Sequence, residues 1–92
     1  MMATSKDGWC NKSDAEILNS LRDWVLRCDL KYSKREALKK IDSAFALWGG
    51  RQYVAAVDLL DENEVYFSKE DWPYYALGIE ILKARQYTHF YE

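Results

Sequence analysis

The side chains that could act as nucleophile, base or metal ligand are few in this sequence. It has one histidine, His89, and two cysteines, Cys10 and Cys28. Catalysis needs a nucleophile or base held beside an orienting group, and neither cysteine has a histidine at a recognised spacing. The same three residues do not form the paired spacings of structural zinc, and Gly49-Gly50 lacks the Lys-Ser or Lys-Thr of a phosphate loop. We therefore expect no enzyme, no metal and no cofactor.

Charged residues form two clusters, although 13 Lys and Arg nearly balance 15 Asp and Glu. Residues 27–40 hold six cations against two acids, a net of +4, and residues 58–71 hold six acids against one lysine, a net of −5. We expect the two segments to occupy different faces. The basic one could neutralise phosphates of nucleic acid, but without interleaved aromatics or a recognition helix a solvated surface is favoured. The candidate phosphate-binding residues are Arg27, Lys31, Lys34, Arg35 and Lys39.

Aromatic side chains are abundant, with four Trp, seven Tyr and three Phe among 92 residues. A core of this size cannot bury them all, and Tyr and Trp are enriched at protein interfaces. The sequence therefore predicts stoichiometric binding to a larger macromolecular partner, as an inhibitor, immunity or anti-defence protein, or adaptor. The partner is expected to be a protein; nucleic-acid binding and homodimer formation are the alternatives. The candidate partner-binding residues are Tyr66, Trp72, Tyr74, Tyr87 and Tyr91.

The elements that would position these residues are helical. Ser13 stands three residues before Glu16, the spacing of a capping box. An apolar stripe with helical period, which includes Trp24, follows to Cys28 and is expected to face the core. Ser33 and Glu36 have the same capping-box spacing, which predicts a second helix over Lys34 to Trp48. Gly49 and Gly50 then favour the left-handed conformation that closes a helix.

The second half of the chain continues this pattern. Tyr53 to Leu60 is a third, shorter apolar-periodic segment, and Val65 to Phe67 is an apolar bridge, either extended or a loose helical turn. Ser68 or Asp71 can cap a fourth helix that carries Pro73 in its first turn. The sequence shows no sustained period-two alternation of apolar and polar residues, so it predicts no strands. We expect an all-α fold, a small bundle of about four antiparallel helices, with residues 1–12 as a flexible arm and 13–92 as one domain.

One internal repeat is present: Arg51-Gln52-Tyr53 recurs 34 positions later as Arg85-Gln86-Tyr87. With Tyr74, Leu77 and Gly78, the second copy resembles the spacing of tetratricopeptide repeats, whose period is 34 residues. The resemblance covers residues 37–92 and implies stacked helix hairpins with a concave groove. Lys40 and Ser43 depart from the pattern, and the alternative is an irregular bundle in which the triplet is coincidental.

Signals for export or membrane insertion are missing from the sequence. Met1 to Gly8 contains no apolar stretch, and no apolar run approaches the length that a membrane-spanning helix needs. We therefore expect a soluble protein in the reducing cytoplasm.

Overall fold

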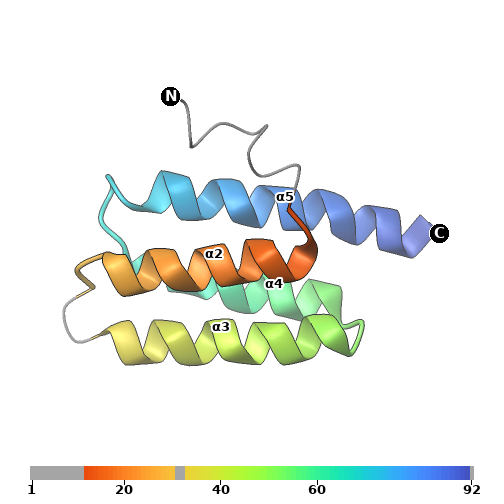
Figure 1. Ribbon diagram of the computed structural model, residues 1–92, viewed down its shortest axis with the longest axis horizontal. Coiled ribbons are helices and arrows are strands. Elements are labelled where there is room, and N and C mark those ends of the chain that lie inside the picture. The colour runs from red at the N-terminus through yellow and green to blue at the C-terminus, as the bar shows by residue number, and fades with distance from the viewer. Residues whose placement is uncertain (1–11, 31–32, 92) are drawn as a thin grey trace.

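Four α-helices and one short 3-10 helix make up the computed structural model, which describes residues 12–30 and 33–91, with side chains to residue 86. Each helix runs antiparallel to its packing neighbours (Figure 1). α2 packs against α3 and α5, and α4 packs against the same two helices. The prediction of an all-α antiparallel bundle is confirmed, and the described residues include no strand. The elements are α2 (Asp14–Arg27), α3 (Lys34–Gly49), α4 (Tyr53–Asp61), η2 (Glu62–Tyr66) and α5 (Trp72–Tyr91).

Only one of the two predicted capping boxes forms. At α2, the Ser13 hydroxyl accepts the Glu16 amide proton at 3.2 Å, and the Ser13 amide donates to the Glu16 carboxylate at 2.8 Å. This hydrogen bond to the charged form lowers the pKa of Glu16. At α3, Ser33 makes no side-chain cap bond because its backbone is already helical, whereas a capping hydroxyl needs an extended backbone. The helix start was predicted correctly there, but the cap was wrong.

The turn after α3 differs from the glycine closure expected from the sequence. Gly49 is the last residue of the helix, and Gly50 has φ −88°. The left-handed residue is Arg51, with φ 67°. Backbone bonds hold it there: the Arg51 amide donates to Trp48 at 3.0 Å and the Gln52 amide to Leu47 at 2.8 Å. The predicted left-handed role of Gly49 and Gly50 is therefore wrong.

The start of α5 follows the prediction. The Asp71 amide donates to the Ser68 hydroxyl at 3.2 Å, and the Trp72 amide donates to the Ser68 carbonyl at 3.0 Å. Pro73 is the second residue of α5, where a missing N–H breaks no helical bond. Of the predicted apolar bridge, Val65 and Tyr66 end the 3-10 helix η2, and Phe67 after them has an extended backbone.

One polar side chain among the described residues, Asn63, is fully buried in the apolar core. Its Nδ2 donates to the Tyr75 hydroxyl at 3.0 Å and to the Ala37 carbonyl at 3.3 Å. The Tyr75 hydroxyl in turn donates to the Leu60 carbonyl at 3.2 Å. This network joins η2 to α3, α4 and α5. The apolar core around it comprises Ile17, Leu18, Leu21, Val25, Cys28, Leu30, Ala37, Ile41, Ala44, Trp48, Ala56, Val57, Leu60, Tyr75, Ile79 and Leu82.

At the opposite end of the bundle, Asp14 ties three helices together. Its carboxylate accepts the Trp48 indole N–H at 2.9 Å and a guanidinium N–H of Arg85 at 2.9 Å. Asp14 begins α2, Trp48 lies near the end of α3, and Arg85 lies in α5. These bonds fix the register of α2 against both of its neighbours.

The two copies of the repeated triplet adopt different structures. Arg51 and Gln52 form the turn between α3 and α4, whereas Arg85 to Tyr87 lie inside the continuous helix α5. The resemblance to tetratricopeptide repeats stays a prediction. Among the described helices none is both long and apolar enough to span a bilayer.

Candidate functional site

A stacked aromatic pair lies at the surface between α2 and α5. The rings of Trp24 and Tyr74 have centroids 4.3 Å apart and planes tilted by 34°. The Trp24 indole N–H donates to the Asp71 carbonyl at 3.0 Å, which ties α2 to the residue just before α5. Both rings are half-buried. The pair is therefore exposed to solvent on one side and held in a fixed orientation on the other.

Two hollows flank this aromatic pair. On the α5 side, a mainly apolar hollow of about 400 Å³ is lined by Trp24, Tyr74, Pro73 and Leu77, with Glu70 as its charged residue. On the α2 side, a smaller hollow of about 130 Å³ is lined by the same two rings with Ser20, Asp23 and Arg27. We call Trp24, Pro73, Tyr74 and Leu77 the α2–α5 aromatic surface.

The structure brings one of the five predicted partner-binding residues, Tyr74, to this surface. Trp72 turns toward the core, with ring centroids 5.4 Å from Tyr75 and 5.9 Å from Phe67. Tyr66 is half-buried and lines a separate hollow of about 320 Å³ beside Val65, Asp29 and Leu30. Tyr87 and Tyr91 lie in α5, but their side chains are outside the described set.

Sequence reasoning missed three members of the surface. It placed Trp24 on the core-facing stripe of its helix, where the structure finds it half-buried at the edge. Pro73 was interpreted only as a helix-start residue. Leu77 lies one turn after Pro73, and this four-residue spacing on α5 is the signal that could have joined them to Tyr74.

The predicted phosphate-binding residues are only partly available to a ligand. The Lys34 ammonium donates to the Leu26 carbonyl at 2.9 Å, which satisfies the end of α2. Lys31 lies outside the described residues. Arg27, Arg35 and Lys39 are exposed and form no ion pair with any residue in the described ranges.

The basic and acidic segments adjoin, which corrects the expectation that they occupy different faces. Lys40 in α3 pairs with Glu62 in η2 at 2.8 Å. Asp29, in the turn after α2, lines the same hollow as Val65 and Ser68. The η2 helix follows α4 back to the end of the bundle where α3 begins, so the fold places acids beside the basic turn. This proximity weakens any positive field there.

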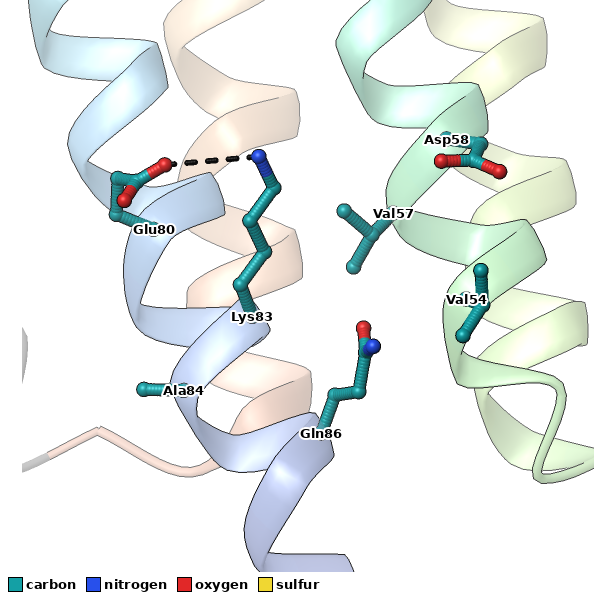
Figure 2. A pocket seen from close by; sticks show the side chains of 7 residues that line it. All are labelled: Val54, Val57, Asp58, Glu80, Lys83, Ala84 and Gln86. Atoms are coloured by element: carbon teal, nitrogen blue, oxygen red, sulfur yellow. Dashed lines mark ion pairs between the residues drawn. The ribbon is translucent and has the colours of Figure 1, made fainter. Parts of the chain in front are cut away.

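A further hollow, of about 540 Å³, lies between α4 and α5 (Figure 2). Val54 and Val57 form its α4 wall, and Lys83 and Gln86 reach into it from α5 (Figure 2). The Lys83 ammonium lies 3.6 Å from both Glu80 and Asp61. The one cation that lines the groove is therefore paired within the chain, and Asp58 on α4 adds a further exposed acid to its lining.

Cys28 is the described residue with a thiol, and its environment disfavours the thiolate. Burial, strengthened by the nearby Asp71, raises the pKa of the Cys28 thiol to about 11, so the thiolate that would act as nucleophile is scarce at neutral pH. No group of three or more His, Cys, Asp or Glu within the described ranges could hold a metal ion.

Comparison with known proteins identifies no relative: no family model, no curated protein and no solved structure matches this chain.

Proposed function

We propose that this protein acts by stoichiometric binding to a protein partner through the α2–α5 aromatic surface. The observation that carries the proposal is the Trp24–Tyr74 pair, half-exposed yet fixed by ring stacking and by the bond from Trp24 to the Asp71 carbonyl. Arg27 lies beside it. Trp, Tyr and Arg are the residue types most enriched at interface hot spots. Rings already fixed before binding lose less conformational entropy when a partner covers them.

The shape of the surface supports the same proposal. A hollow on each side of the aromatic pair provides space for side chains of a partner, and the apolar walls of the larger one would be removed from water on binding. The α2–α5 aromatic surface has a charged rim, formed by Asp23, Arg27 and Glu70. Protein interfaces likewise have an apolar centre and a polar periphery.

Affinity capture from an extract of the native host, followed by native mass spectrometry, tests this proposal. Wild-type protein should hold one partner in a fixed ratio. Leu77→Gln and Tyr74→Ala should each reduce capture at least tenfold, because a lost hot-spot contact is worth about 2 kcal/mol or more. Val54→Ala, an exposed position on α4, is the matched control. Equal capture by wild type and both surface variants, with helix content unchanged by circular dichroism, would refute the proposal.

A further inference from the structure

The charges around the α2–α5 aromatic surface are arranged so that the surface complements itself. Arg27 is the last residue of α2 and lines the hollow on the α2 side. Glu70 lies two residues before the start of α5 and lines the hollow on the α5 side. α2 ends at the same end of the bundle where α5 begins (Figure 1). The cation and the acid therefore lie at one level, on opposite sides of the aromatic pair.

Both charges are available for pairing between molecules. Arg27 and Glu70 are exposed, and neither forms an ion pair with another residue that the structure describes. A two-fold axis that runs parallel to the helices, along the aromatic pair, would place α2 of one molecule over α5 of the other. In such an isologous contact, every contact between two residues occurs twice, once on each side of the axis. Arg27 of each copy would then face Glu70 of the other.

We infer that a second copy of this chain covers the α2–α5 aromatic surface in the free protein, with two Arg27–Glu70 pairs flanking the four central rings. The inference rests on the proposed function, because it uses the same surface. It adds a regulatory consequence: a partner must displace the second copy before it can bind. Partner capture per molecule should therefore fall as the protein concentration rises, by the linkage between competing equilibria.

The expected dimer is weak. α2 has 14 residues, so it is about 21 Å long, and two adjacent helices are about 20 Å wide. The contact would bury about 400 Å² on each copy, about 800 Å² in total, which is less than a standard specific interface and in the range of weak, transient contacts. Asp23, one turn before Arg27, would face uncharged residues of α5, which limits the affinity further.

Sedimentation velocity from about 10 µM to about 1 mM, the range over which an interface of this size should dissociate, tests the inference. We expect monomer at the bottom of the range and dimer at the top. Arg27→Glu and Glu70→Arg each place like charges opposite one another and should weaken association at least fivefold. The double variant restores opposite charges and should recover dimer formation. Arg35→Glu, an exposed cation on α3, is the control.

Three results would overturn the inference: monomer at every concentration, association equally sensitive to Arg35→Glu, or a double variant no better than the single ones. These results are independent of the proposed function, because a monomeric protein can still capture a partner through Tyr74 and Leu77. Loss of capture without loss of dimer would instead count against the proposed function alone.

Discussion

The buried pair of Asn63 and Tyr75 is the least expected feature at the scale of single residues. Two polar side chains in an apolar core are tolerated only when they are hydrogen-bonded. Here the Tyr75 hydroxyl both accepts from Asn63 and donates to the Leu60 carbonyl. Because its burial disfavours the charged form, the pKa of Tyr75 is raised well above its usual value. Burial therefore favours the neutral hydroxyl, which is the form that donates to the Leu60 carbonyl.

Tyr75→Phe should lower the free energy of unfolding by about 1 to 3 kcal/mol, because it leaves a buried donor and a buried acceptor without their partner. Urea denaturation followed by circular dichroism measures this loss. Tyr66→Phe removes the same atom from a half-buried ring and should change stability by less than about 0.5 kcal/mol. Equal losses in the two variants would mean that the network contributes nothing beyond burial.

At the scale of elements, local signals predicted helix positions better than helix ends. The signals Ser13 with Glu16 and Ser68 with Pro73 each lie within six residues of sequence, and the structure confirms both starts. Ser33 shows the same spacing as Ser13, but the turn closed by its amide bond to Leu30 holds its backbone in helical conformation. A sequence pattern cannot reveal that constraint, because it is set by the turn from α2.

The two serines provide a matched test of capping. Ser13→Ala removes a hydroxyl that accepts a backbone amide proton, and should lower stability by about 1 kcal/mol. Ser33→Ala removes a hydroxyl with no cap bond and should cost less than about 0.5 kcal/mol. Thermal or urea unfolding of both variants distinguishes them. A larger loss at Ser33 would contradict the cap assignment.

The turn after α3 leads to a prediction opposite to the one that the glycine pair suggests. Gly49 is helical, and a Cβ built there meets nothing within 4 Å. Gly49→Ala should therefore stabilise the protein by up to about 1 kcal/mol, because alanine favours the helix and loses less entropy on folding. If Gly49 instead held a left-handed conformation, the same substitution would destabilise it. Urea denaturation gives the sign directly.

The candidate site was harder to predict than the fold, and for a physical reason. Periodicity shows which side of a helix is apolar, but Trp24 lies at the edge of its stripe, and only the packing of α5 decides how much of its ring stays exposed. Tyr74 was identified because aromatic side chains exceed what the core can bury. Trp72, chosen on the same ground, packs against Tyr75 instead. Composition predicts that some aromatics are exposed, and tertiary packing selects which.

At the scale of the whole molecule, the charge distribution indicates that any binding to nucleic acid has low affinity. Arg27, Arg35 and Lys39 are the exposed cations of the predicted cluster that the structure describes, and acids of η2 lie close by. With three phosphates neutralised, the slope of log affinity against log salt should be no steeper than about −2.7 for duplex DNA. Fluorescence anisotropy at several salt concentrations measures it. A slope steeper than about −4 would revive the nucleic-acid alternative.

The packing of α2 against α5 also sets the order in which the molecule can assemble. α3 and α4 are joined by a short turn, so this hairpin closes at little entropic cost. The bonds from α2 to α5 instead join residues 47 and 71 positions apart. At a synthesis rate of about 5 to 20 residues per second, several seconds pass between the synthesis of α2 and that of α5. During this time α2 lacks one of the two helices that pack against it. We therefore expect α2 to expose part of its apolar stripe during translation until α5 emerges from the ribosome.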